Sequence, residues 1–185
     1  MTSGMQQAKQ PVSALLTGPY GHPLHPMLVT VPIGAWVASL VFDVGSLLAG
    51  KPGFLTQGSE WLIAVGVLGA LAAALVGFLD LAAIPAGTPA FRTACTHMCL
   101  NLGITAAYAG NFLWRRGSYA DGGAVRPAML ALSAVSMLAL GLSGYLGGKL
   151  AYRWGVRVAD EQTQAEGFAV AASERAGGHR APHPG

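Results

Sequence analysis

Charged side chains are scarce in this chain of 185 residues, where they make up only 10% of the total. A soluble domain usually carries about 25% charged residues. Apolar residues account for 52% of the chain, and a soluble protein this short could not remove so much apolar surface from water. The composition therefore argues against an ordinary soluble domain and indicates a protein that folds in lipid.

Several patterns that would assign a function are also missing. The net charge is only +3, and the basic residues form no block with interleaved aromatics, so we expect no nucleic-acid partner. The glycines are dispersed through apolar segments instead of building a phosphate-binding loop, and no serine sits in a nucleophile elbow. The first twenty residues lack the apolar core of a cleavable signal peptide. These absences make a soluble enzyme an unfavoured interpretation.

Cysteine is rare as well. Cys95 and Cys99 lie four positions apart inside an apolar segment, which argues against a disulfide framework. We expect both to be small packing residues. The order of residues around them also lacks the C-x-x-C-H pattern of a c-type haem site.

Long apolar runs are what the sequence does have. A membrane-spanning helix needs about 20 mostly apolar residues, and four segments meet this length, namely residues 27–49, 61–84, 93–114 and 127–150. Their connections are short, and short loops join antiparallel neighbours. The sequence therefore predicts an all-α, integral membrane four-helix up-down bundle over residues 21–158, preceded by a polar segment over residues 1–20.

The last part of the chain, residues 159–185, changes to a polar composition. We expect a disordered C-terminal tail here, with a short helix around residues 165–176. An even number of spans places both termini on one side of the membrane. Basic residues are divided almost evenly between the two ends of the bundle, with a slight excess that favours cytoplasmic termini.

Antiparallel spans bring polar residues from all four segments to one end of the bundle, called end A here. End A receives histidines, a carboxylate, cations and tyrosines: His22, His25, Asp80, Arg92, His97, Tyr145, Lys149 and Tyr152. The opposite end, end B, receives Asp43, Glu60, Arg115 and Arg116. Ionisable residues inside a membrane are costly and usually face the protein interior, so we expect a polar site at end A.

The third segment carries a polar stripe. Its members follow one another at steps of four, four and three positions: His97, Asn101, Thr105 and Tyr108. Such steps place side chains on one face of a helix. We expect this face to point into the bundle.

Three histidines at one end favour a cofactor site, because neutral imidazole binds metals and is an axial ligand of haem iron. His97 opposite His25 or His22 would hold a b-type haem, whereas the three histidines with Asp80 would hold a transition metal. The predicted surroundings of these ligands are Arg92, Asn101, Tyr145 and Lys149. The leading interpretation is a haem- or metal-binding redox component in the lipid bilayer.

Structural roles also fit these residues. His22 and His25 suit the start of a helix that has Pro26 at its first position. His97 suits a hydrogen-bonded structural histidine. Asp80 would then close the end of the bundle through an ion pair with Arg92 or Lys149.

Two other functions stay open. A transporter or proton-relay subunit would use Asp43, His25 and His97 along an internal path, although the sequence shows no symmetry between its two halves. A structural or assembly factor would use ladders of small residues to bind partner helices or a second copy of the chain. Those ladders are Gly69, Ala73 and Gly77 in the second segment, and Gly144 and Gly148 in the fourth.

Two motifs resemble those of a known family. The opening GHPLHP, residues 21–26, and VPIG, residues 31–34, resemble the start of a bacterial multi-pass membrane family known as domain of unknown function 2231. The later matches are Gly77 to Asp80, Arg92, His97, Asn101, Gly144 to Leu150, Tyr152, Gly155 and Val158. The resemblance implies a four-span protein of the bacterial inner membrane. Some relatives are joined to iron–sulfur modules, which implies an electron-transfer setting and a redox partner protein.

Overall fold

The structure is a computed structural model that describes residues 3–9, 23–117 and 122–168. This part of the chain is helical and contains no strand. The elements in chain order are α1 (Ser3–Lys9), α2 (Leu24–Leu28), α3 (Thr30–Leu48), α4 (Gly53–Ala82), α5 (Pro89–Arg116), α6 (Pro127–Gly148), the π-helical turn η3 (Lys149–Arg153) and α7 (Glu161–Glu166).

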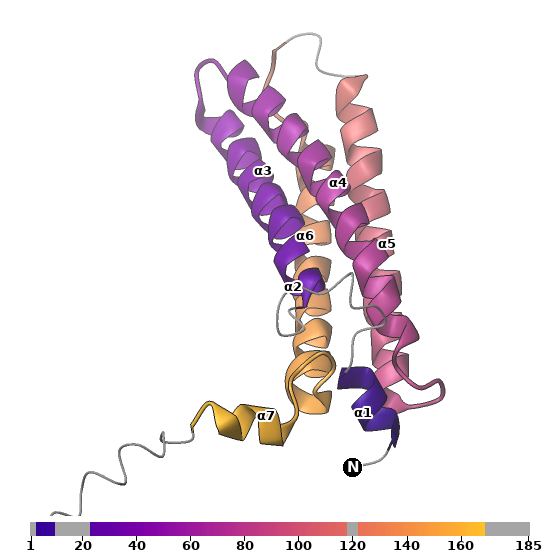
Figure 1. The fold of residues 1–185 in the computed structure, drawn as a ribbon. Coiled ribbons are helices and arrows are strands. Elements are labelled where there is room, and N and C mark those ends of the chain that lie inside the picture. The colour runs from indigo at the N-terminus through magenta and orange to yellow at the C-terminus, as the bar shows by residue number, and fades with distance from the viewer. Residues whose placement is uncertain (1–2, 10–22, 118–121, 169–185) are drawn as a thin grey trace, which may run out of the picture.

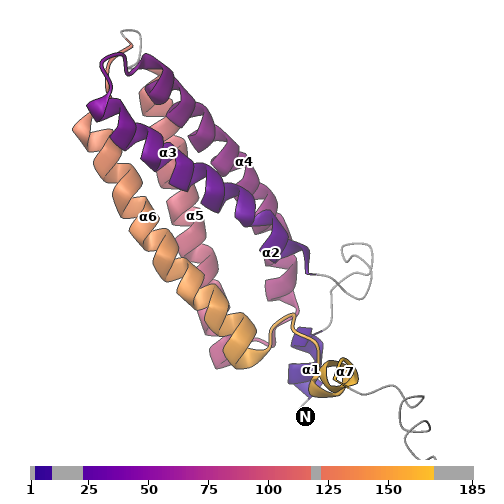
Figure 2. The same ribbon diagram turned by 90° about the vertical axis from the view of Figure 1, so that its left-hand side faces the viewer.

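The long helices α3, α4, α5 and α6 lie side by side (Figures 1 and 2). The helix α3 packs mainly on α4, α5 packs on α6, and α4 also packs on α5. End A holds α2, the end of α4, the start of α5 and η3, whereas the ends of α3 and α5 and the starts of α4 and α6 lie at end B (Figure 1). The short helices α1 and α7 lie beyond end A, where Lys9 Nζ is 3.5 Å from a carboxylate oxygen of Glu161.

Three helical stretches of the described residues have the length and apolar composition to cross a membrane. They are Leu24–Leu48, Gly53–Ala82 and Pro127–Arg153. The helix α5 is of similar length, with 28 residues, but it is more polar because it carries the polar stripe and two arginines at its end. Most of these polar side chains are buried or half-buried, and of the two arginines Arg115 is buried and Arg116 exposed.

Apolar side chains cover the outside of these helices, and polar side chains fill much of the inside. Large exposed side chains include Val41, Leu68, Leu75 and Leu138. Fully buried polar side chains include Ser39, Asp43, Asn111, Arg115 and Ser133. This distribution is the reverse of that in a soluble protein and suits lipid as the surrounding solvent. Cys99 also faces outward as a free thiol instead of packing inside.

Proline and threonine set the starts of the helices. The Thr88 hydroxyl accepts a hydrogen bond from the Phe91 amide at 3.1 Å, and Pro89 takes the first position of α5. Proline suits this position because the amide hydrogen that it lacks would have no helical partner there. Pro32, by contrast, interrupts a helix. Its ring crowds the carbonyl of Leu28, and its nitrogen has no hydrogen to donate to that carbonyl. The chain therefore breaks between α2 and α3.

The structure changes one expected boundary. The helix α4 begins at Gly53 instead of near Trp61, because the polar residues before Trp61 face the interior of the bundle and do not form a loop. The short helix α7, with Asp160 at its N-cap, overlaps the start of the range 165–176 where a short helix is expected, and residues 169–176 of that range are outside the described residues. Residues 169–185, where most of the expected disordered tail falls, lie outside the described residues.

Candidate functional site

His25 from α2 and His97 from α5 lie next to each other at end A. Their ring centroids are 6.4 Å apart, and the ring planes cross at 78°. Both residues are half-buried. Both α2 and α5 pack on α4, and this packing brings two histidines that are distant in the sequence to one place, as the order of the spans predicts.

A backbone carbonyl on a neighbouring helix orients each imidazole. His25 Nδ1 lies 2.9 Å from the carbonyl oxygen of Ala73 on α4, and His97 Nδ1 lies 2.9 Å from that of Ser143 on α6. A carbonyl oxygen can only accept a hydrogen bond, so Nδ1 carries the hydrogen in both rings. In the neutral form, Nε2 then holds the electron pair that binds a metal. Histidine ligands of metals show this same second bond to a carbonyl or carboxylate.

A glycine on the same neighbouring helix makes room for each ring. A Cβ atom at Gly77 would lie 2.9 Å from His25 Cε1, and one at Gly147 would lie 3.2 Å from His97 Cε1. Each glycine follows the accepting carbonyl by one helical turn. The rings therefore reach these carbonyls because no side chain stands between them and the helix backbone.

The polar stripe of α5 continues inward from His97. Asn101 Nδ2 lies 3.2 Å from His97 Nε2 and 2.9 Å from the His97 carbonyl oxygen. The Thr105 hydroxyl donates to the Asn101 carbonyl at 2.8 Å, and the Tyr108 hydroxyl donates to the Ser133 carbonyl at 3.2 Å. The stripe faces the interior, as its spacing predicts, and Asn101 contacts the candidate ligand atom directly.

The contacts of the two histidines are repeated along the chain. Three pairs on α2–α3 and α5 are 72 positions apart, namely His25 and His97, Trp36 and Tyr108, and Asp43 and Arg115. Their partners on α4 and α6 are 70 positions apart, namely Ala73 and Ser143, Gly77 and Gly147, and Ile63 and Ser133. The segment from α2 to α4 and the segment from α5 to α6 are therefore two halves with corresponding contacts.

This symmetry is hidden in the sequence because most corresponding residues differ in type. Trp36 matches Tyr108, and Asp43 matches Arg115. Of the six pairs named above, only the histidines and the two glycines beside them are the same residue in both halves. The expectation that the halves show no symmetry was wrong for this reason, since contacts and not residue types are repeated.

Of the two other predicted ligands, only Asp80 falls within the described residues, and it has an ion-pair partner of its own. His22 lies outside the described residues. The Asp80 carboxylate forms an ion pair with Arg157, whose Nε lies 3.1 Å from Oδ1, and not with Arg92 or Lys149. Arg157 has a left-handed backbone with φ of 59°, so the segment after η3 turns back over end A and brings this guanidinium to Asp80.

The remaining predicted surroundings point away from the histidines. Arg92 is exposed. Tyr145 and Lys149 lie two positions before and after Gly147, so each is turned about 200° around the helix from it. Since Gly147 faces His97, both side chains start from a different face of the helix. Tyr145 is exposed, and Lys149 Nζ lies 5.0 Å from the centroid of the Trp154 ring.

No group of three or more histidine, cysteine, aspartate or glutamate side chains in the described residues is arranged to hold a metal ion. A site built from protein ligands alone needs at least three of them. A haem needs only two axial ligands from the protein. The pair of His25 and His97 therefore has enough ligands for a haem, but too few for a metal ion held by protein ligands alone.

A second polar centre lies toward end B, where Asp43 and Arg115 form a fully buried ion pair. Nη1 and Nη2 each lie 2.7 Å from a carboxylate oxygen, and both side chains are 0% exposed. The other N–H groups of Arg115 donate to Asn111 at 3.0 Å, to Ser59 at 3.0 Å and to Ser133 at 3.4 Å. These partners come from α3, α4, α5 and α6, so the pair fixes the four helices relative to one another.

Comparison with known families agrees with this architecture. Residues 21–160 match a family described as "Predicted membrane protein (DUF2231)". The chain belongs to this family. Both histidines and the buried ion pair lie within the matched residues. No curated protein and no solved structure matches the chain.

Sequence reasoning placed Asp43 and Arg115 of this DUF2231 protein at the same end but did not pair them. The signal that could have found the pair is the spacing of 72 positions, which is also that of the two histidines. A single charge inside a membrane is costly and needs a partner. Two opposite charges that lie in two apolar segments are therefore the first candidates for an ion pair with each other.

A packed aromatic layer separates the two polar centres of the DUF2231 domain. The rings of Trp36 and Tyr108 stack with centroids 4.1 Å apart and planes at 12°. Ile63 and Ile104 complete a buried cluster with them, and Trp36 Nε1 donates to the Ile63 carbonyl at 3.3 Å. This cluster lies between the histidine pair and the ion pair of Asp43 and Arg115.

Proposed function

We propose that this protein binds a b-type haem between His25 and His97 and carries electrons in the membrane. The observation that supports the proposal is the separation of 6.4 Å between the two ring centroids. A bond from a metal to an imidazole nitrogen is about 2.0–2.1 Å long. Two imidazoles that each gave one nitrogen to a shared iron would therefore have centroids roughly 6 Å apart. When bound, the haem supplies an iron that changes between its ferric and ferrous states.

The residues of the chain would hold and tune such a cofactor. The carbonyls of Ala73 and Ser143 fix the tautomer of each histidine and make Nε2 a better ligand. Asn101 donates to His97 Nε2 and would release it to the iron. The apolar cluster below the pair would keep water away, which is one of the means by which a protein sets a reduction potential.

The proposal includes the arrangement in the membrane. In it, α5 crosses the bilayer as a fourth span, and the protein is a four-helix up-down bundle in the bacterial inner membrane with cytoplasmic termini. The inward polar face of α5 supports this, because its side chains find partners inside the protein. A cofactor at end A would then lie near one membrane surface, within reach of a redox partner protein.

The absorption spectrum of the protein purified in mild detergent from haem-replete cells tests this function. We expect a haem spectrum that changes on reduction and that is lost in both H25A and H97A. Because the contacts of the two histidines correspond, the two losses should be similar in size. The matched control C99A changes an outward side chain on the helix that carries His97 and should keep the spectrum.

A rescue experiment separates ligation from folding. In H97G, added imidazole should restore the spectrum if the histidine is a ligand. Colourless, metal-free wild-type protein from such cells would contradict the proposal. A coloured protein whose spectrum is unchanged in H25A would contradict the assignment of the ligands.

The repeated contacts favour one second candidate, a proton-relay or transporter subunit. Such proteins often consist of two corresponding halves with the site between them. In this candidate His25 and His97 pass protons toward Asp43, and the layer of Trp36 and Tyr108 opens during transport. Proton flux into vesicles that is lost in both H25A and H97A, from protein that contains no haem, would favour this candidate over the first.

A further inference from the structure

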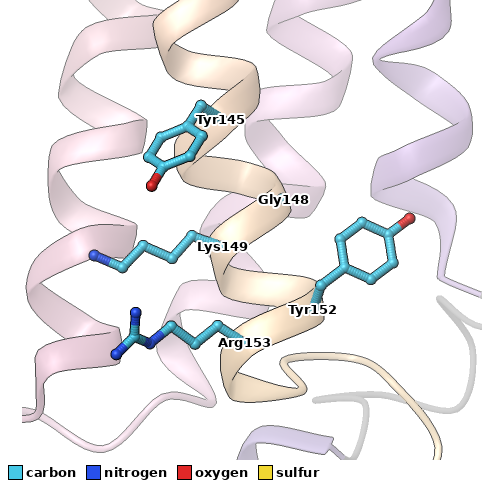
Figure 3. Close-up of a pocket in the computed structure, with 5 residues that line it drawn as sticks. All are labelled: Tyr145, Gly148, Lys149, Tyr152 and Arg153. Atoms are coloured by element: carbon cyan, nitrogen blue, oxygen red, sulfur yellow. The ribbon is translucent and has the colours of Figure 1, made fainter.

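We propose that the end of α6 binds the headgroup of an anionic phospholipid, at a site separate from the histidine pair and independent of the proposed function. The structure has a shallow open hollow here, and five residues of α6 and η3 line it (Figure 3). They are Tyr145, Gly148, Lys149, Tyr152 and Arg153.

The positive charge of this hollow is not neutralised by nearby carboxylates. Lys149 and Arg153 are one helical turn apart and extend to the same side of the helix (Figure 3). Among the described residues neither forms an ion pair, whereas Asp80 pairs with Arg157 and Glu161 with Lys9 at this end. Lys149 Nζ lies 5.0 Å from the centroid of the Trp154 ring, an aromatic contact that leaves its charge without a counter-ion. Two adjacent cations without a counter-charge are a site for a phosphate group.

The depth of the hollow in the membrane selects a lipid as the occupant. The apolar helical stretch Pro127–Arg153 has 27 residues, and about 20 suffice to cross the hydrocarbon core. One end of the stretch therefore reaches the headgroup layer. Tyr145 and Tyr152 are 69% and 93% exposed, and tyrosine is enriched at this layer.

The surface beside the cations suits an acyl chain. A Cβ atom at Gly144 would meet nothing within 4 Å, and one at Gly148 would meet only Tyr152. The ladder of Gly144 and Gly148 thus faces outward. In the other ladder of small residues, Gly69 and Gly77 face neighbouring helices. The helix also changes to the wider π form at Lys149, a change that is frequent at functional sites.

Native mass spectrometry of the full-length protein, released from nanodiscs with equal amounts of phosphatidylglycerol and phosphatidylcholine, tests this site. We expect the wild type to retain phosphatidylglycerol several-fold more often. The double variant K149Q/R153Q should lose this preference, and the charge-conserving K149R/R153K should keep it. The control K51Q/R126Q removes two exposed charges at end B and should behave as the wild type.

Four outcomes would overturn the proposal. Equal retention of both lipids by the wild type would show that no selective site exists. An equal loss in the control would show a general effect of charge. Displacement of the lipid by an equal concentration of inorganic phosphate would assign the site to a soluble anion. A dimer that K149Q/R153Q disrupts would assign the surface to a second copy of the chain. Equal helical circular dichroism of all variants shows that each is folded.

Discussion

At the residue scale, two glycines decide how closely the histidines approach their carbonyl partners. We expect Gly77→Ala to displace His25, because the added methyl group would lie 2.9 Å from the ring, closer than carbon atoms approach without repulsion. Gly147→Ala should act in the same direction on His97 but less strongly, since the distance there is 3.2 Å. The readout is the haem content of the purified variants.

Gly144 provides the matched control for this prediction. It lies on α6, three positions before Gly147, and a methyl group there would meet nothing within 4 Å. G144A should therefore keep the haem content of the wild type. If G77A and G144A lowered it equally, the glycines would act through general helix packing and not through the histidines.

A second prediction at this scale concerns the buried ion pair. R115A leaves Asp43 without a partner in a site that is 0% exposed, and breaking such a pair costs about 3–5 kcal/mol. The double variant D43L/R115M removes both charges and should recover much of this loss. Thermal unfolding in detergent measures both effects.

The neighbouring pair of Arg116 and Glu60 is the control. Arg116 is 56% exposed and lies 3.4 Å from the carboxylate of the buried Glu60, so water screens and partly replaces this interaction. R116A should therefore lower the stability far less than R115A. Equal losses in R115A and R116A would mean that burial of the pair with Asp43 does not hold the helices together.

At the scale of single elements, the short helix α7 depends on one cap. Asp160 Oδ1 accepts a hydrogen bond from the Thr163 amide at 2.9 Å. This bond to the backbone lowers the pKa of Asp160 below its usual value, because it stabilises the ionised carboxylate. The cap therefore contributes fully above the usual value of about 3.9 and is lost as the pH falls through the lowered pKa.

We expect the Thr163 amide to stay protected from hydrogen exchange down to mildly acidic pH and to lose protection at lower pH. D160A should remove the protection at every pH, because alanine cannot accept the bond. Protection in D160A equal to that of the wild type would show that the cap does not hold α7.

The existence of the long helices could be predicted from the sequence better than their ends. Apolar runs of about 20 residues indicate helices without reference to neighbours. The early start at Gly53 could not be found in this way, because Thr56, Ser59 and Glu60 look like loop residues until their burial is known. The partner of Asp80 was missed for a similar reason, since Arg157 reaches it through a turn with a left-handed residue.

At the scale of the whole molecule, the composition of the sequence predicts a membrane environment. The antiparallel order of the spans predicts that His25 and His97 lie at the same end. Composition and topology could not reveal that the two halves make corresponding contacts. Trp36 and Tyr108 occupy corresponding positions but are different residue types, and so do Asp43 and Arg115. The outward direction of Tyr145 and Lys149 also depends on which face of α6 packs inward. That face is decided by Ser143 and Gly147, which in the sequence look like ordinary small residues.

The central claim is that two imidazoles from corresponding halves of the bundle ligate one iron. Low-temperature electron paramagnetic resonance of the oxidised protein tests it most directly, because the signal reports both axial ligands at once. We predict a low-spin ferric signal with the strong anisotropy of imidazole planes that cross at a large angle, here 78°. A high-spin ferric signal, or no haem signal from haem-replete cells, would contradict the account.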